Sequence, residues 1–98
     1  MSLTLTVRPV ARTELNKAVD WYEAEKPGLG DRFTDAVRRV FAEITTNPRR
    51  YAVEYKDVRE AMVEGFPYCV YFRVRANRAI VISVFHTSRD PSVWQSRA

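Results

Sequence analysis

The sequence predicts an α+β fold of two layers, in which a hairpin of two helices packs on a curved antiparallel sheet. Two observations lead to this prediction. Apolar residues in the first half of the chain recur with the period of a helix, whereas those in the second half form short runs rich in β-branched and aromatic side chains. The expected order of elements is β-α-α-β-β-β with a short C-terminal helix. At this length, residues 1–98 are expected to form a single domain.

The first half predicts one strand and two helices. Residues 3–8 alternate apolar and polar side chains, as a half-buried strand does, and Pro9 suits the first turn of a helix. The first helix, which Pro27 and Gly28 end, is expected to bury Leu15, Ala18, Val19 and Tyr22. The second helix, which ends at Asn47, has the clearest apolar stripe in the chain, formed by Phe33, Ala36, Val37, Val40, Phe41 and Ile44.

The second half predicts three strands and a final short helix. Residues 58–63 carry charged side chains between apolar ones, which favours a position near an edge of the sheet. Residues 68–74 are apolar on both faces in their middle, and residues 79–85, nearly continuous in Ile and Val, are expected to be central to the sheet. Residues 88–91 then cap a short helix around Trp94.

Composition excludes several classes of protein. With 29% charged residues and three glycines, the chain is not collagen-like, low-complexity or wholly disordered. No apolar run approaches the ~20 residues of a membrane-spanning helix and no signal peptide opens the chain, so we expect a soluble cytoplasmic protein. The chain has a single cysteine, Cys69, and a single histidine, so we expect no disulfide, metal or cofactor. Cys69 lies in an apolar run and is interpreted as a core side chain.

The positive charge lies in the second half of the chain. The net charge is +4, and residues 49–98 carry the whole excess, with nine basic and five acidic side chains. Thirteen of the sixteen basic residues are arginine, whose planar fork of donors suits phosphate and carboxylate groups. The distribution therefore favours a phosphate-bearing target or an acidic protein partner, although a charge of this size also serves solubility.

Short blocks along the chain resemble a known family. They are Trp21-Tyr22-Glu23 and residues 27–30 in the helical hairpin, residues 47–51 after it, Val58-Arg59, the run 66–72, and residues 86–91 with Trp94. In order and spacing these blocks resemble the RelE/ParE toxin superfamily, from Pro9 to about Arg97. They are more similar to its ParE, or plasmid-stabilization, branch than to its RelE branch. The resemblance implies the same β-α-α-β-β-β fold and the toxin half of a bacterial type II toxin–antitoxin module.

ParE-type toxins, as the resemblance implies, inhibit growth by binding DNA gyrase, and a cognate antitoxin protein neutralises them. The antitoxin is expected to be acidic in the segment that folds onto the toxin. A toxin homodimer and a toxin–antitoxin heterotetramer both stay open as assemblies. We expect contacts with the target or the antitoxin at Arg49, Arg59, Arg73, Arg89 and Trp94.

The alternative function is ribosome-dependent cleavage of mRNA, the activity of RelE-type members. There the 2′-hydroxyl attacks the adjacent phosphate, which requires a base, cations for the charge on phosphorus and an acid for the leaving oxygen. Tyr68 stands where these nucleases carry an arginine, and Trp94 stands where they carry a tyrosine, so the sequence favours a binding toxin over an enzyme. A third class, an interaction domain without toxicity, also stays open. Under the nuclease alternative the catalytic residues are His86, Arg89, Arg59 and Arg73.

Each candidate residue also has a structural interpretation. His86 would end the central strand and bond to backbone, or would act as acid or base, because histidine exchanges protons near neutral pH. Arg89 and Asp90 would form a local salt bridge and a helix cap. Trp94 would dock the last helix against the sheet or, if exposed, anchor a partner.

Overall fold

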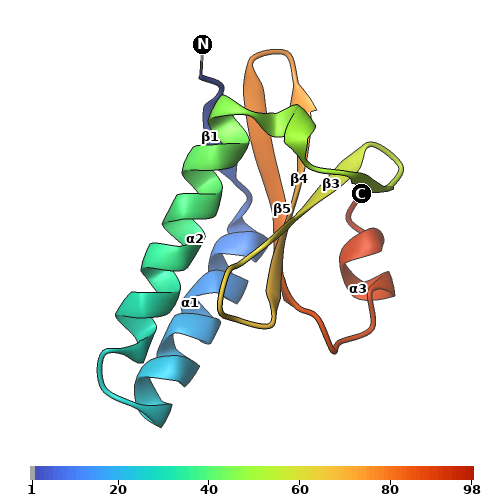
Figure 1. The fold of residues 1–98 in the computed structure, drawn as a ribbon. Coiled ribbons are helices and arrows are strands. Elements are labelled where there is room, and N and C mark those ends of the chain that lie inside the picture. The colour runs from blue at the N-terminus through green and yellow to red at the C-terminus, as the bar shows by residue number, and fades with distance from the viewer. Residues whose placement is uncertain (1) are drawn as a thin grey trace.

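The computed structural model describes residues 2–98. They form one sheet with helices on both of its faces (Figure 1). The strands are β1 (Thr4–Val7), β2 (Val53–Tyr55), β3 (Val58–Met62), β4 (Tyr68–Arg75) and β5 (Arg78–His86). Helices α1 (Pro9–Glu25) and α2 (Leu29–Thr46) form a hairpin on one face, and a 3-10 helix, η1 (Pro48–Arg50), follows α2. The short helix α3 (Ser92–Gln95) lies on the opposite face. Within the described residues, no helix combines the length and the apolar character that crossing a membrane requires.

The predicted α+β fold is confirmed, and its sheet is mixed. The strand order is β1-β5-β4-β3-β2. Strands β3, β4 and β5 form the expected antiparallel meander, whereas β1 runs parallel to β5, with Thr4 opposite Arg78. Strand β2 was not predicted from the sequence, because three residues are too few to show a period. Strand β5 is paired on both sides, as its apolar sequence predicted, although β4 is the central strand.

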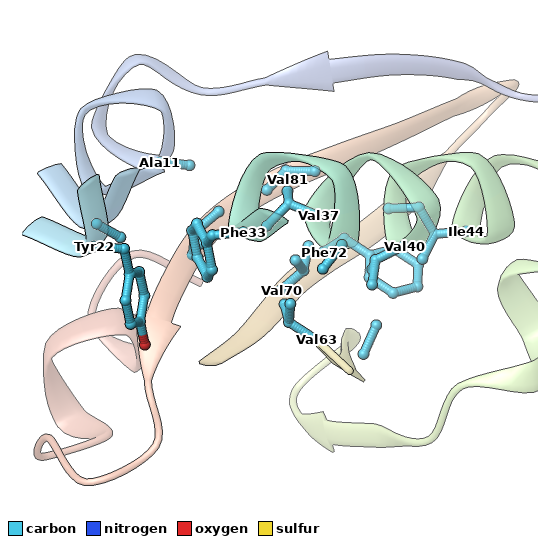
Figure 2. Close-up of a cluster of buried hydrophobic side chains, with 14 residues drawn as sticks. Ala11, Tyr22, Phe33, Val37, Val40, Ile44, Val63, Val70, Phe72 and Val81 are labelled. Carbon is cyan, nitrogen blue, oxygen red and sulfur yellow. The ribbon is translucent and has the colours of Figure 1, made fainter. Parts of the chain in front are cut away.

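Helix α2 buries more apolar side chains against the sheet than α1 does. Phe33, Val37 and Ile44 are at most 1% exposed and belong to one apolar cluster with Phe72 and Val81 of the sheet (Figure 2). These α2 side chains recur at helical spacing, so they project from one side of the helix. The predicted stripe is therefore confirmed, with only its member Phe41 left partly exposed.

Helix α1 contacts the core along a narrower line. Ala11, Ala18 and Tyr22 are buried, whereas the predicted Leu15 and Val19 are only partly buried. These positions lie on the flank of the buried line rather than at its centre, since successive helical residues are about 100° apart. The flanks of α1 therefore border the surface of the molecule.

The opposite face of the sheet has its own apolar cluster. Trp94 of α3 is 2% exposed and stacks on Tyr71 with ring centroids 3.8 Å apart and planes 14° apart. Val58, Ile82 and Phe85 are buried in the same cluster. Trp94 thus docks the last helix, which confirms the structural interpretation of this residue.

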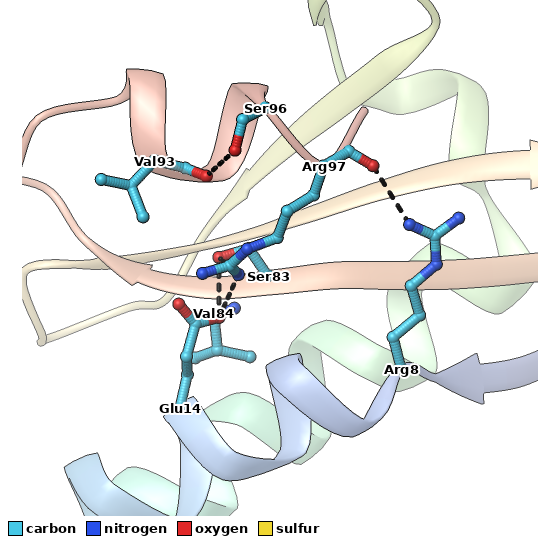
Figure 3. A network of polar contacts seen from close by, with 7 residues as sticks. All are labelled: Arg8, Glu14, Ser83, Val84, Val93, Ser96 and Arg97. Atoms are coloured by element: carbon cyan, nitrogen blue, oxygen red, sulfur yellow. Dashed lines mark hydrogen bonds and ion pairs between the residues drawn. The ribbon is translucent and has the colours of Figure 1, made fainter.

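A polar network fastens the C-terminus to the start of α1 (Figure 3). Strand β1 ends at Val7, opposite Val81, so the N–H of Val84 farther along β5 has no strand partner on that side. Glu14 of α1 fills this position: its Oε1 accepts bonds from the Val84 N–H (3.1 Å), the Ser83 hydroxyl (2.8 Å) and Arg97 (3.0 Å). A side chain at a helix flank therefore completes the hydrogen bonding of a sheet edge.

Candidate functional site

Two of the four predicted catalytic residues lie on opposite faces of the sheet. Arg59 of β3 is directly opposite Phe72 and shares its face, the one under the helical hairpin, where it donates to the carbonyl of Tyr51 at 2.6 Å. Arg73 of β4 is opposite Ile80, a member of the cluster on the α3 face. The two guanidinium groups therefore cannot converge on one phosphate.

Arg73 is also committed to an ion pair. Its Nη2 lies 3.1 Å from Oδ1 of Asp57, and its side chain is only 12% exposed. Asp57 also pairs with Arg75. Partial burial acts to raise the pKa of Asp57, but Arg73 and Arg75 outweigh it and hold that pKa below its usual value. This pairing joins the turn between β2 and β3 to strand β4.

His86 and Arg89, the other two predicted catalytic residues, lie near each other at the far end of the sheet. Together with Tyr68 they line a hollow of about 430 Å³ between α1 and the ends of β4 and β5. His86 is opposite Tyr68 in register, and the two rings meet edge to face with centroids 5.1 Å apart. Arg73 is five residues from Tyr68 along β4, so it lies about 16 Å from this hollow at the rise of a strand.

The ring of His86 is oriented by its own loop. Its Nδ1 accepts the backbone N–H of Ser88 at 3.0 Å, and the Ser88 hydroxyl lies 2.8 Å from the same nitrogen. An Nδ1 that accepts a hydrogen bond carries no proton, so in the neutral ring the proton is on Nε2. The geometry therefore assigns a tautomer in which Nε2 is a hydrogen-bond donor.

Arg89 and Asp90 do not pair with each other. Within residues 2–98 Arg89 forms no salt bridge, and its guanidinium lies over the ring of Phe85 at 4.6 Å from the centroid. Asp90 accepts the N–H of Ser92 at 3.0 Å in the turn before α3, whose N-cap residue, Pro91, makes no side-chain cap bond. The exposed Arg89 side chain is therefore available to a partner.

Of the two remaining predicted contact residues, one is accessible and one is not. Arg49 lies in η1 and is exposed. The indole of Trp94 is buried between α3 and the sheet, so its assignment as a surface contact is corrected. A partner cannot reach this indole while α3 is in place. The five predicted contact residues thus do not form one continuous patch.

Helix α1 contributes residues to the hollow that were not among the predicted site residues. Trp21 and Lys17 line the same hollow as His86 and Arg89, and Trp21 is 59% exposed. The signal was present in the sequence, because Trp21 falls outside the apolar stripe of its helix. An indole in such a position is exposed to solvent, and exposed tryptophans are enriched where proteins bind each other.

Cys69 is inaccessible, as predicted for a core side chain. It is 1% exposed, and burial is the main reason that the pKa of its thiol is raised to about 12. The thiolate that a nucleophile requires is therefore absent at neutral pH. Among residues 2–98 the structure contains no group of three or more His, Cys, Asp or Glu side chains placed to hold a metal ion.

Comparisons with known proteins agree with this fold. Residues 5–91 match the family described as the ParE toxin of the type II toxin–antitoxin system parDE. Among solved structures, a chain of the chromosomal ParDE TA system from P. aeruginosa superposes with a TM-score of 0.78 at 16% sequence identity, covering 89% of this chain and 98% of that one. A search of curated proteins finds no significant match. Since the family match spans most of the sequence, the chain belongs to the ParE toxin family of type II toxin–antitoxin systems.

Proposed function

We propose that this chain inhibits bacterial growth by binding DNA gyrase in the cytoplasm, and that a cognate antitoxin neutralises it. Membership of the ParE family makes it a toxin of a toxin–antitoxin pair. The choice of binding over catalysis rests on one observation, the dispersal of the candidate catalytic residues. Arg59, Arg73 and the pair His86–Arg89 occupy three separate places on the sheet.

Cleavage of RNA would require these groups to act on a single phosphodiester. A general base must lie within about 3 Å of the oxygen whose proton it removes, and the cations must lie beside the same phosphate. Arg59 instead satisfies a backbone carbonyl, and Arg73 neutralises Asp57. Both arginines therefore have structural partners that a substrate would need to displace.

The tautomer of His86 also argues against catalysis. A base needs an unprotonated, accessible nitrogen, but Nδ1 is engaged by Ser88 and Nε2 carries the proton. Acting as an acid would require the imidazolium form, which would lose the bond from the Ser88 N–H. The resting geometry suits His86 to donating a hydrogen bond to a bound partner.

Two of the arginines predicted to contact the target or the antitoxin are accessible. Arg49 and Arg89 are exposed, whereas Arg59 and Arg73 are engaged within the fold. Arg49 is the one assigned to the acidic segment of the antitoxin, so replacing Arg49 with glutamate should weaken the toxin–antitoxin complex and leave the stability of the toxin unchanged. Unchanged affinity of the folded Arg49→Glu variant would contradict this part of the proposal.

The nuclease alternative keeps one observation in its favour. His86, Tyr68 and Arg89 line one hollow, so a hydrogen-bond donor, a phenol and a cation are close together there. However, burial raises the pKa of Tyr68, which makes the phenol a poorer source of a phenolate base at neutral pH. A site limited to these three residues would also lack a second cation on the phosphate.

One experiment separates the two functions. The toxin is induced briefly in bacteria, and DNA breaks and mRNA 5′ ends are mapped in the same cells. Gyrase inhibition predicts DNA breaks with intact messages. It also predicts that the messages are intact in wild type and His86→Ala alike. Cleaved messages that become intact in the His86→Ala variant would refute the proposal and establish the nuclease. Purified gyrase, assayed for supercoiling with and without the toxin, provides the direct test.

A further inference from the structure

We propose that this chain contacts gyrase through the surface formed by Trp21, Tyr68, His86, Lys17 and Arg89, called here the Trp21 surface. Its expected ligand is an acidic side chain next to an apolar or aromatic one, presented by the folded target. The inference rests on the proposed function and adds to it the location of the target contact.

The shape of the Trp21 surface suits a few protruding side chains. A hollow of about 430 Å³ lies on one side, between α1 and the ends of β4 and β5, and a second hollow of about 360 Å³ lies beside it. Trp21, Tyr68 and His86 line both hollows. Aromatic rings thus stand between two recesses, each with a volume that fits a small number of side chains.

Trp21 is exposed but held in place. Its ring meets that of Tyr22 edge to face, with centroids 5.1 Å apart. Tyr22 is 9% exposed and packs against Phe33 and Phe66, each 5.0–5.1 Å away. Because Tyr22 is itself packed in the core, one side of the indole rests against a fixed ring, which reduces the conformational freedom that it can lose when a partner binds. An exposed indole supported in this way is typical of an interface hot spot.

The charge of the surface is positive. Glu14 and Arg97 also line the larger hollow, but they neutralise each other at 3.0 Å. Lys17 and Arg89 remain, both exposed and neither in a salt bridge within residues 2–98. A carboxylate placed between these cations would gain charge-assisted hydrogen bonds, with the Nε2–H of His86 as a further donor.

The mixed charge beside the indole favours a protein over nucleic acid. Asp20 and Glu25 are exposed on α1 next to Trp21, where they would repel a phosphate backbone. A protein surface with a single acidic side chain avoids this repulsion. The positive hollow and the acidic end of α1 therefore match a partner with localised charge.

A separate groove leaves the antitoxin a surface of its own. It lies between α1, α2 and β1, has a volume of about 330 Å³, and is lined by Leu15, Val19 and Phe41 with Arg12 and Arg38 among its polar residues. This groove uses the opposite flank of α1 from the one that carries Lys17 and Trp21. An apolar groove between two helices and a strand suits a segment that folds on binding, whereas the Trp21 surface suits a target that is already folded.

The test compares variants of the Trp21 surface with matched changes elsewhere. Trp21→Ala and Lys17→Glu are assayed for binding to purified bacterial gyrase holoenzyme, for inhibition of supercoiling and for binding to the antitoxin. Met62→Ala truncates another exposed side chain (65% exposed), and Arg39→Glu makes the same change of sign on α2, so both serve as controls. Circular dichroism and urea unfolding verify that each variant is folded.

We expect Trp21→Ala to weaken gyrase binding at least about 10-fold, as for an interface hot spot. Lys17→Glu should weaken it about threefold, with a smaller effect at high salt. Both variants should bind the antitoxin normally, and both controls should match the wild type. Unchanged gyrase inhibition by folded Trp21→Ala and Lys17→Glu would overturn the inference alone. Loss of antitoxin binding in either variant, with or without loss of gyrase binding, would also overturn it. A wild-type protein that does not bind gyrase would instead refute the proposed function, and the inference with it.

Discussion

Glu14 should be among the most sensitive charged positions for stability. Its side chain is 13% exposed, and its Oε1 accepts from the Val84 N–H, the Ser83 hydroxyl and Arg97. Glu14→Ala would leave a backbone N–H, a hydroxyl and a guanidinium without this acceptor. Removing one partner of a fully buried ion pair costs about 3–5 kcal/mol. Arg97 is 21% exposed, so water partly replaces the lost contact. We therefore expect the free energy of unfolding to fall by an amount at the lower end of this range, about 3 kcal/mol.

Glu14→Gln separates the charge from the hydrogen bonds. The amide oxygen can still accept from Val84 and Ser83, whereas the ion pair with Arg97 is lost. We therefore expect a cost of about 1.5 kcal/mol, close to that of one hydrogen bond to a charged group. Arg50 and Glu43, which are 63% and 51% exposed, form the matched exposed pair, and their coupling should stay below about 0.5 kcal/mol.

Urea unfolding followed by circular dichroism measures these differences. A double-mutant cycle with Glu14→Gln and Arg97→Gln gives the coupling energy of the pair, and a second cycle with Glu43→Gln and Arg50→Gln gives the exposed reference. The reasoning fails if Glu14→Ala changes the free energy of unfolding by less than about 0.5 kcal/mol, the usual range of a surface substitution. It also fails if the two cycles yield equal coupling energies.

Three further predictions concern other parts of the fold. Trp94→Ala should lower the free energy of unfolding by about 3–5 kcal/mol, measured in urea, because it leaves a cavity where the indole stacks on Tyr71. Trp94→Phe should lower it less, since a second ring fills part of the space and the buried Nε1 of Trp94 has no hydrogen-bond partner within the described residues. Equal losses for the two variants would argue against this account. The negative charge of Glu60 raises the pKa of Glu54 in the folded protein above its value in the unfolded chain. Glu54 therefore stabilises the fold at a pH below the unfolded pKa, where it is protonated, and this stabilisation is lost as the pH rises through the folded pKa. Glu54→Gln should therefore stabilise the protein relative to wild type at pH 7 but not near pH 3, and a pH-independent difference between their urea curves would contradict this. Cys69 should resist Ellman's reagent at pH 8 until the protein is unfolded, and prompt reaction of the native protein would show that the thiol is accessible.

The elements of this fold could be predicted because their signals are local. Phe33, Val37 and Ile44 recur at helical spacing whatever the rest of the chain does, and they are the residues that the structure buries. The apolar run of residues 79–85 likewise predicted a strand paired on both sides. The family resemblance was equally a property of short blocks in the sequence, and the match over residues 5–91 confirms it.

The site could be predicted only in part, because it depends on register and on contacts between distant segments. Whether Arg59 and Arg73 share a face follows from their partners, Phe72 and Ile80, and a slip of one residue would exchange the faces. The burial of Trp94 was an open alternative in the sequence, since it depends on where α3 lies.

The sequence by itself determined the helices, the principal strands, the apolar stripe of α2 and the toxin family. The tertiary structure alone decided that β1 runs parallel to β5, that Glu14 completes the edge of the sheet, and that Trp21 stands beside His86 and Arg89. The physical reason is range. Periodicity acts within a few residues, whereas Glu14 and Val84 are brought together across 70 positions by the packing of α1 on the sheet.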